Sequence, residues 1–273
     1  MLHLINSNTK LNAYATTESI DAFASSEEIR TYRNNRLIKY LSAVNFIKNR
    51  SDSYSKGLKV VEIGSGSSAL LYGMADKKMI SHGCGIELSS SRFDFAELWK
   101  LECGYHCIEN INQSFTDVKF QNSFFDWFIV IDNTFTYLHP VNEKYPKLLL
   151  SRAFEALVEG GRILLDFFNY TKRTPGVELQ QWNVFCKNDP FSYGLYSHLI
   201  ENGINTTNSI FIRRVTAEEE MKVEMSKVYS FVEINALLES NGFSVQEVFS
   251  TFGGDLYDES ESERIVIVAK KGV

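Results

Sequence analysis

The sequence predicts an α/β protein built on a seven-stranded, mostly parallel sheet with helices on both faces. Along the middle of the chain, strand-length apolar segments alternate with segments that have a helical spacing of apolar residues. The segment 127–132, WFIVID, is nearly all apolar, which is typical of a central strand buried on both faces. Near the end of the chain, a helical segment precedes two alternating segments that suit a closing antiparallel pair.

The expected elements of this core follow one another in a regular order. We expect strands at 58–63, 82–88, 105–110, 126–132 and 161–168, with helices at 67–77, 91–102 and 145–158. A helix at 231–241 and strands at 244–250 and 264–271 complete the sheet. The core therefore comprises residues 57–170 and a C-terminal part, residues 231–273.

Two segments are expected to lie outside the sheet. Residues 1–56 include apolar residues at helical spacing from 17 to 49, which predicts an N-terminal helical cap across the ligand-binding edge. In residues 171–230, strand-length segments are joined by turns rich in Asn and Gly and lack a helical period. This pattern predicts a small antiparallel β insertion.

The composition restricts the class of protein and of partner. The chain has 273 residues, 44% hydrophobic and 23% charged, which suits one soluble domain with additions. A net charge of −6 argues against a nucleic-acid partner, since phosphate groups require a basic face. Neither a signal peptide nor a membrane span is apparent, so we expect a cytoplasmic protein, monomer or homodimer, with a small-molecule partner. The spacing of Cys103, His106 and Cys107 matches no common zinc signature, and no metal is expected.

A glycine turn between two strands is the most informative feature of the sequence. The segment VVEIGSGSS at 60–68 predicts a buried strand, a turn and a helix start, and CGIELS at 84–89 predicts the next strand. This is the Rossmann-like order of a nucleoside-binding α/β half. We expect Gly64 and Gly66 to let the backbone approach a ligand where a Cβ atom would collide.

Two acids next to this turn define the ligand. Glu62 can pair with an amine, and Glu87, at the end of the second strand, can accept hydrogen bonds from both hydroxyls of a ribose. A dinucleotide is disfavoured because the third glycine of its fingerprint would fall at Ala69, and a phosphate loop lacks its lysine. The pattern fits a nucleoside that carries an amino acid and a sulfonium, namely S-adenosylmethionine.

On these residues the sequence resembles the class I S-adenosylmethionine-dependent methyltransferases, whose first motif has the form E/D-x-G-x-G-x-G. Ser68 replaces the last glycine. The FTYLH segment at 135–139 resembles the active-site loop of glycine and amino-sugar N-methyltransferases, and the C-terminal part resembles small-molecule members. The resemblance covers 58–170 and 228–273, and it implies this cofactor, S-adenosylhomocysteine as product, an amine acceptor, and a lid role for the β insertion.

The resemblance also implies further cofactor residues. In relatives, an acid after the third strand meets the adenine amine, and here Ser114 stands in its place. We expect Ser114 and the backbone N–H of Phe115 to contact adenine, although a plain surface loop is the alternative. Leu88 follows the ribose acid, and Asp132 begins the loop after the fourth strand, where we expect it to border the methionine moiety.

The acceptor side is less well defined. If a base removes a proton from the acceptor, His139 or a polarising Tyr137 is the candidate, although His139 can equally be a capping or surface residue. Other candidates for lining the acceptor pocket come from the fifth strand end and from the cap; they are Asn169, Tyr170, Tyr14 and Tyr32. The Asn-Pro-Pro-Tyr loop of DNA amine methyltransferases is absent, which argues against a nucleobase acceptor.

The predicted function is therefore methyl transfer from S-adenosylmethionine to an amine or hydroxyl of a small polar metabolite, with a nucleotide-linked amino sugar as the specific candidate. Two alternatives stay open: a binding protein that keeps the fold without turnover, and a small-molecule O-methyltransferase of a natural-product or surface-polysaccharide pathway. A nicotinamide-dependent oxidoreductase is disfavoured because it requires the full glycine fingerprint.

Overall fold

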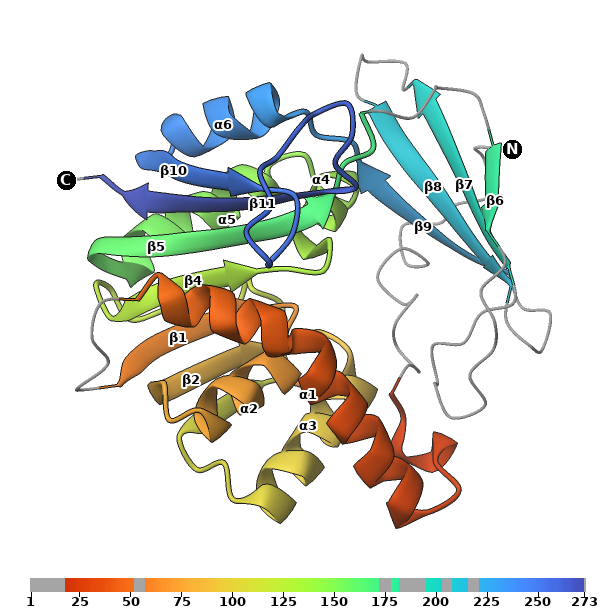
Figure 1. Ribbon diagram of the computed structural model, residues 1–273, viewed down its shortest axis with the longest axis vertical. Helices are drawn as coiled ribbons and strands as arrows, with labels where there is room; N and C mark the ends of the chain where they lie inside the picture. The colour runs from red at the N-terminus through yellow and green to blue at the C-terminus, as the bar shows by residue number, and fades with distance from the viewer. Residues whose placement is uncertain are drawn as a thin grey trace.

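The computed structural model describes residues 18–51, 57–171, 178–181, 195–202, 208–215 and 221–272. Its main body is a seven-stranded sheet with helices on both faces (Figure 1). The strands are β1 (Leu58–Ile63), β2 (Ile80–Ile86), β3 (Ile108–Ile111), β4 (Phe125–Val130), β5 (Leu157–Phe168), β10 (Phe243–Phe249) and β11 (Arg264–Lys271). The helices are η3 (Ile20–Ala22), α1 (Ser26–Asn49), α2 (Ala69–Asp76), α3 (Ser90–Cys103), η4 (Thr134–Tyr137), α4 (Leu138–Val141), α5 (Tyr145–Ala156) and α6 (Phe231–Glu239). The predicted fold class is confirmed.

The strand order places β1 beside β4 at the centre of the sheet. The order is β10-β11-β5-β4-β1-β2-β3. β1 to β5 pair in parallel, whereas β11 runs antiparallel to both β5 and β10, as predicted for the closing pair. The chain proceeds in opposite directions across the sheet from β1 and from β4, so their carboxyl ends meet at the point where open α/β sheets bind ligands.

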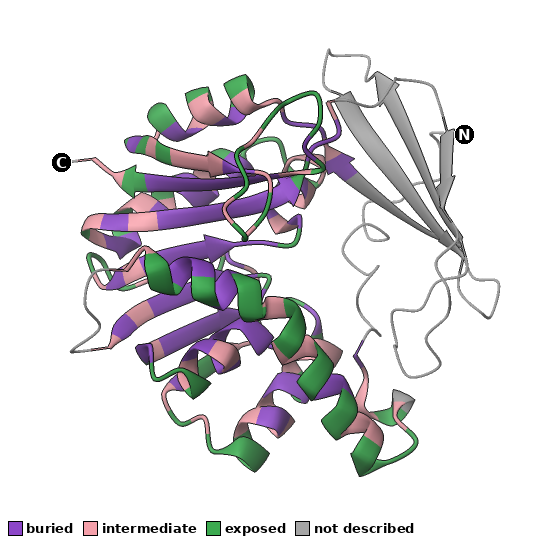
Figure 2. Cartoon of the chain, viewed as in Figure 1, coloured by how far each residue is buried: buried purple, intermediate pink, exposed green. Residues whose placement is uncertain are grey.

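The two faces of the sheet are buried by different helices. Val60, Trp127 and Ile129 pack in one cluster with residues of α1, α2 and α3. Val61 and Phe128, their neighbours in sequence, pack in another with residues of α5 and α6. Successive side chains of a strand point to opposite faces, so a central strand covered on both sides must be apolar throughout. Figure 2 shows these central strands as mainly buried.

Some element boundaries differ from the predicted ones. β2 ends at Ile86, so Glu87 directly follows the strand instead of lying within it. β3 begins at Ile108 rather than 105, because the left-handed Gly104 ends α3 and a turn follows it. β5 begins at Leu157, earlier than predicted, and runs through an irregular pairing with β4.

The insertion between β5 and α6 forms a sheet of its own. Its strands are β6 (Glu178–Gln181), β7 (Leu195–Asn202), β8 (Asn208–Val215) and β9 (Met221–Lys227), and each pairs antiparallel with the next. The predicted antiparallel insertion is present within residues 171–230. Its role as a lid stays a prediction.

Helix α1 packs along α2 beside the sheet. Its first turn is capped by the Ser25 hydroxyl, which accepts a hydrogen bond from the Glu28 N–H at 3.2 Å. Gly73 of α2 leaves room for Val44, whose Cγ2 would lie 3.1 Å from a Cβ at that glycine. The N-terminal end of α1 extends past the carboxyl edge of the sheet (Figure 1). None of the described helices is long and apolar enough to cross a bilayer.

Candidate functional site

The glycine turn joins β1 to α2 through three left-handed residues. Gly64, Gly66 and Ser68 have φ values of 70°, 56° and 58°. A Cβ on Gly64 would lie 2.6 Å from the side chain of Thr134, so this glycine makes room for the loop after β4. Whether Gly64 also lets a ligand approach stays a prediction. Gly66 differs, since the nearest atoms to its notional Cβ are 3.9 Å away.

Glu87 holds the turn from the neighbouring strand. Its buried carboxylate accepts hydrogen bonds from the Gly66 N–H at 2.7 Å and from the Ser89 N–H at 2.8 Å, one on each oxygen. Each carboxylate oxygen has a second lone pair, so Glu87 can still accept two hydroxyl hydrogens. Leu88, next in the chain, is 47% exposed and offers an apolar surface at the same edge.

Glu62 is buried without a complete set of partners. Among the described residues, its Oε2 atom has no hydrogen-bond partner, and neither have the buried hydroxyls of Ser65 and Ser67 in the turn. Burial raises the pKa of Glu62 well above its ordinary value; the charge of Asp132 adds to this, while Arg36 opposes it. Buried polar atoms are nearly always paired in folded proteins, so three such atoms beside one turn are expected where a ligand supplies their partners.

The left-handed backbone conformation of Ser68 contributes to the shape of the turn. Its side chain is fully buried and donates a hydrogen bond to Oδ1 of Asn110, on β3, at 2.6 Å. The contact of Ser68 with the cofactor stays a prediction. The left-handed φ of Ser68 is the conformation that glycine adopts most easily, which fits its place in the motif.

The loop after β3 is organised by its own side chains. The Ser114 hydroxyl accepts hydrogen bonds from the hydroxyl of Thr116 at 2.8 Å and from its N–H at 3.3 Å. Phe115 is buried against Tyr145, with ring centroids 5.6 Å apart. The loop thus has a fixed shape, and its contact with adenine stays a prediction.

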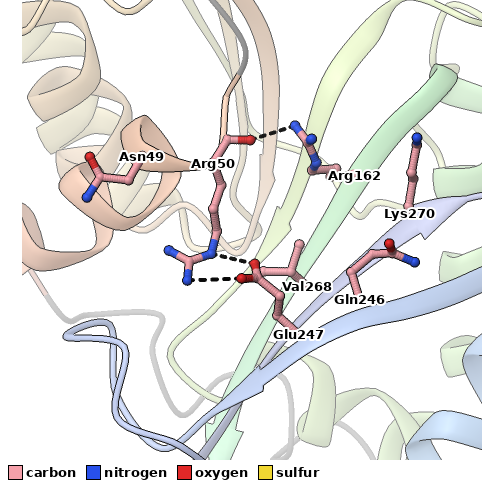
Figure 3. A pocket seen from close by; sticks show the side chains of 7 residues that line it. All are labelled: Asn49, Arg50, Arg162, Gln246, Glu247, Val268 and Lys270. Carbon is pink, nitrogen blue, oxygen red and sulfur yellow. Dashed lines mark hydrogen bonds and ion pairs between the residues drawn. The ribbon is translucent and has the colours of Figure 1, made fainter.

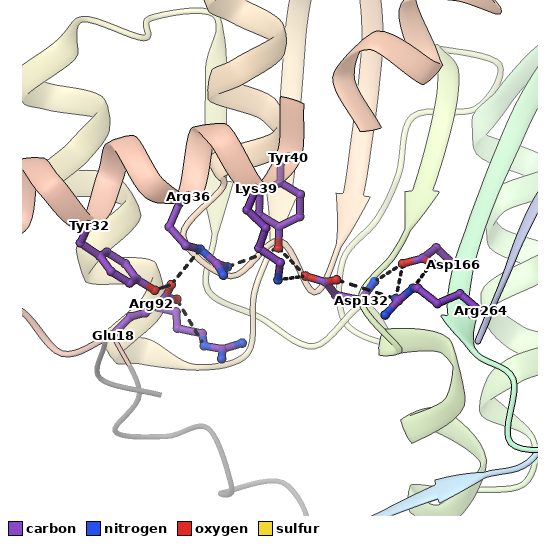
Figure 4. A network of polar contacts seen from close by, with 9 residues as sticks. All are labelled: Glu18, Tyr32, Arg36, Lys39, Tyr40, Arg92, Asp132, Asp166 and Arg264. Atoms are coloured by element: carbon purple, nitrogen blue, oxygen red, sulfur yellow. Dashed lines mark hydrogen bonds and ion pairs between the residues drawn. The ribbon is translucent and has the colours of Figure 1, made fainter. Parts of the chain in front are cut away.

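A network of charged residues runs from the cap across the carboxyl edge of the sheet (Figure 4). At one end, the fully buried Glu18 accepts a hydrogen bond from Tyr32 and forms ion pairs with Arg36 of α1 and Arg92 of α3. The Arg36 guanidinium continues the network to the Tyr40 hydroxyl at 3.3 Å. Tyr32 is therefore a buried partner of Glu18, and its contact with the acceptor stays a prediction.

The other end of the network is centred on Asp132. Its Oδ2 accepts hydrogen bonds from Lys39 at 2.9 Å and Tyr40 at 2.5 Å. Its N–H donates to Asp166 at 3.0 Å, and Asp166 in turn pairs through both oxygens with Arg264. Burial alone would raise the pKa of Asp132, but the charge of Lys39 and the hydrogen bonds from Tyr40 and Lys39 lower this pKa below its ordinary range. Asp132 thus ties α1 to the end of β4 as a carboxylate, and its contact with a cofactor stays a prediction.

His139 and Tyr137 lie in the short helical segment after β4, which contacts β9 of the insertion. His139 is half-buried, and its charged neighbours are Lys227, Glu143 and Glu233. Burial, with the charge of Lys227, lowers the pKa of His139 below 6.5, so the imidazole is neutral at pH 7. A neutral imidazole is the form that accepts a proton. The catalytic roles of both residues stay predictions.

The remaining acceptor candidates divide into three cases. Asn169 is buried, and its amide donates to the carbonyls of Glu259 and Ser262 at 2.8 and 3.0 Å, while its Oδ1 accepts from Thr171. It holds the loop before β11, and its place in the acceptor pocket stays a prediction. Tyr170 is buried beside Phe168, and its role stays a prediction. Tyr14 lies outside the described residues.

Comparisons with known proteins were informative only at the level of three-dimensional structure. No family model and no curated protein matches the sequence. The CcbJ methyltransferase of Streptomyces caelestis is 15% identical, with a TM-score of 0.65 over 85% of this chain and 89% of that one. CalS10, an amino pentose methyltransferase of Micromonospora echinaspora solved with S-adenosylmethionine, is 12% identical with a TM-score of 0.59 over 91% and 98%. The glycopeptide N-methyltransferase MtfA with S-adenosylhomocysteine is 14% identical, with a TM-score of 0.57 over 85% and 90%.

The chain has the fold of S-adenosylmethionine-dependent methyltransferases. Within this methyltransferase fold, sequence reasoning named Tyr32 but missed Arg36 and Tyr40, which α1 also brings to the carboxyl edge. Tyr32, Arg36 and Tyr40 are spaced four residues apart, so they share one face of the helix. That spacing indicated a shared polar face, but the sequence alone does not show against which part of the protein this face packs. Glu18 carried no signal of its own.

Proposed function

We propose that this protein is an S-adenosylmethionine-dependent methyltransferase that acts on an amine or hydroxyl of a small polar metabolite. One observation carries the proposal. Glu62 and Glu87 stand at the carboxyl ends of the paired strands β1 and β2, on either side of a turn in which the buried hydroxyls of Ser65 and Ser67 have no hydrogen-bond partner among the described residues. The methyltransferase fold supports the same reading.

The residues present fit this cofactor. Glu87 offers two free lone pairs to the ribose hydroxyls, while its other two hold the turn. The Oε2 atom of Glu62 is suited to the ammonium of the methionine moiety, because a charged donor would supply its missing partner and compensate its burial. Gly66 provides the open approach between them. When bound, the cofactor supplies a methyl group activated by a positively charged sulfur.

The chain itself then has two tasks. The first is to position the acceptor in line with the methyl group, which is the main contribution a protein makes to a displacement of this kind. The second is to accept a proton from an amine or hydroxyl acceptor. His139 is the proposed base, since it is uncharged at neutral pH and lies between the end of β4 and the insertion.

The finer proposal is an amine acceptor, specifically on a nucleotide-linked amino sugar. It is supported by the FTYLH segment that contains Tyr137 and His139, and by the similarity in fold to an amino pentose methyltransferase and a glycopeptide N-methyltransferase. The insertion formed by β6 to β9 is the proposed lid over this acceptor.

Isothermal titration with S-adenosylhomocysteine tests the cofactor. We expect micromolar binding, and Glu87→Ala is expected to weaken it by more than about tenfold, since hydrogen bonds to a charged group contribute about 1.5 to 3 kcal/mol. Unchanged affinity in this variant would refute the ribose assignment.

Turnover is tested separately with methyl-tritiated cofactor and a panel of amino sugars, their nucleotide conjugates and hydroxylated analogues. Binding without label transfer to any substrate class would favour the non-catalytic alternative.

A further inference from the structure

Helix α1 is fixed to the core by ion pairs near both of its ends. At its C-terminal end, Arg50 donates to both carboxylate oxygens of Glu247 on β10, at 2.6 and 3.3 Å. Figure 3 shows this pair beside a groove of about 400 Å³ that Arg162 and Lys270 also line. At the other end, the ion pairs are those of Glu18. The Glu247 pair is remote from the glycine turn, whereas the Glu18 cluster borders it.

Glu18 is completely buried between two guanidinium groups. Its Oε1 lies 3.5 Å from Nε of Arg36, and its Oε2 lies 3.4 Å from Nε of Arg92. The two arginines belong to different helices, α1 and α3, and their side chains are only 17% and 16% exposed. Two poorly solvated cations repel each other, so a shared carboxylate is required to keep them together.

The cluster stands over the open side of the turn. Both Nη1 of Arg92 and Oε2 of Glu18 lie 3.9 Å from the place of a Cβ on Gly66. Arg36 also acts electrostatically on Glu62, at the other side of the same turn. The two guanidinium groups thus flank the region that the proposed function gives to the cofactor. The only anionic group of that cofactor is the carboxylate of its methionine moiety.

We infer that Glu18 is a positioning residue, which holds Arg36 and Arg92 as a pair that receives the amino-acid carboxylate of the cofactor. The inference rests on the proposed function. Glu18 makes no contact of its own with the cofactor here; it offsets one of the two positive charges and fixes the orientation of both guanidinium groups. One net positive charge then remains for the incoming carboxylate, and a guanidinium group is well suited to bind a carboxylate.

Two ligands that differ only in the amino-acid part test this role. S-adenosylhomocysteine carries the carboxylate, whereas 5′-deoxy-5′-methylthioadenosine keeps the nucleoside and lacks the carboxylate. Titration of Glu18→Gln is expected to show at least about tenfold weaker binding of the first ligand and less than about twofold change for the second, because only the first needs the charged pair. Glu247→Gln is the matched control: it removes the ion pair of Arg50 at the C-terminal end of α1 and is expected to bind both ligands like the wild type.

The possible results distinguish a failure of the positioning role of Glu18 from a failure of the proposed function. Equal losses for both ligands, or no loss in Glu18→Gln, would overturn the positioning role while leaving the proposed function intact. A wild-type protein that binds neither ligand would instead refute the proposed function. If Glu18→Gln does not fold, Arg92→Met takes its place, because it leaves the pairing of Glu18 with Arg36 intact. That variant must show the same selective loss, and binding equal to that of the wild type would reject the inference.

Discussion

The backbone N–H of Gly66 donates a 2.7 Å hydrogen bond to the carboxylate of Glu87. An acid at the end of one strand therefore fixes the conformation of the turn that follows its neighbour. The residue predicted to hold the ribose also shapes the site into which the ribose would fit. The proposed ribose contact and the stability of the turn therefore depend on the same carboxylate.

Substitution of Glu87 should consequently affect the ligand-free protein as well. Glu87→Gln leaves one oxygen for the two N–H groups of Gly66 and Ser89, so one of them loses its acceptor. We expect the free energy of unfolding to fall by about 1 to 3 kcal/mol, the usual cost of a buried donor without a partner. Urea denaturation measures this change. A variant as stable as the wild type would show that these hydrogen bonds contribute nothing to the turn.

Substitution of Gly64 and of Gly66 by alanine should have different effects on stability and on ligand binding. Both have a positive φ, so each substitution costs about 1 to 2 kcal/mol in backbone strain. Gly64→Ala adds a collision with Thr134 and should be the less stable variant. Gly66→Ala should remain folded but bind S-adenosylhomocysteine more weakly, because its methyl group enters the open approach. Thermal melts and titrations of the two variants compare the effects; equal melting temperatures would contradict the collision.

Glu62 should make the ligand-free protein less stable as the pH rises. Burial, followed by the charge of Asp132, raises its pKa well above the ordinary value. An acid with a raised pKa in the folded state favours folding fully only below its unfolded pKa, and this contribution is lost as the pH rises through the folded pKa. Glu62→Gln removes the charge, so its stability relative to the wild type should increase across that range, while cofactor affinity falls. Melting temperatures from pH 5 to 9 test the trend, and a constant difference would rule out titration of Glu62.

His139 should affect turnover and not cofactor binding. Burial and Lys227 lower its pKa below 6.5, so a rate that depends on the neutral imidazole should be half-maximal below pH 6.5 and fall on further acidification. His139→Asn should lower kcat and abolish this acidic limb, with the Kd for S-adenosylhomocysteine unchanged. A pH–rate profile identical in the two proteins would remove His139 from the mechanism.

The core of the site was predictable because short-range patterns determine it. The apolar strand before Gly64 and the acid after β2 fix the position of Glu62 and Glu87, since parallel neighbours end at the same edge. The importance of Gly64 in the turn was also predicted, but the close approach of the Thr134 side chain was not. A positive φ can be inferred from a turn motif, whereas the Thr134 side chain that approaches it lies 70 residues away and is brought there by the pairing of β4 with β1.

Contacts between distant elements were beyond the sequence alone. Asn169 ends a strand at the expected edge, yet its amide is used by carbonyls of the loop at 259–262. Glu18 reaches Arg92 only because α1 docks along α2, which depends on packing around Gly73. No periodicity in the sequence encodes the rotation of one helix against another. The contacts that sequence reasoning missed are therefore those whose partners come from a different layer of the fold.

The position of the second sheet has a consequence for how this architecture diversifies. The chain leaves the core after β5 and returns through Tyr229 to α6, and the ladders of β6 to β9 involve no described strand of the main sheet. Replacement of this module by another would leave every ladder of the seven strands intact. A lineage can thus exchange one self-contained sheet without rebuilding the strands and the turn that carry Glu62 and Glu87.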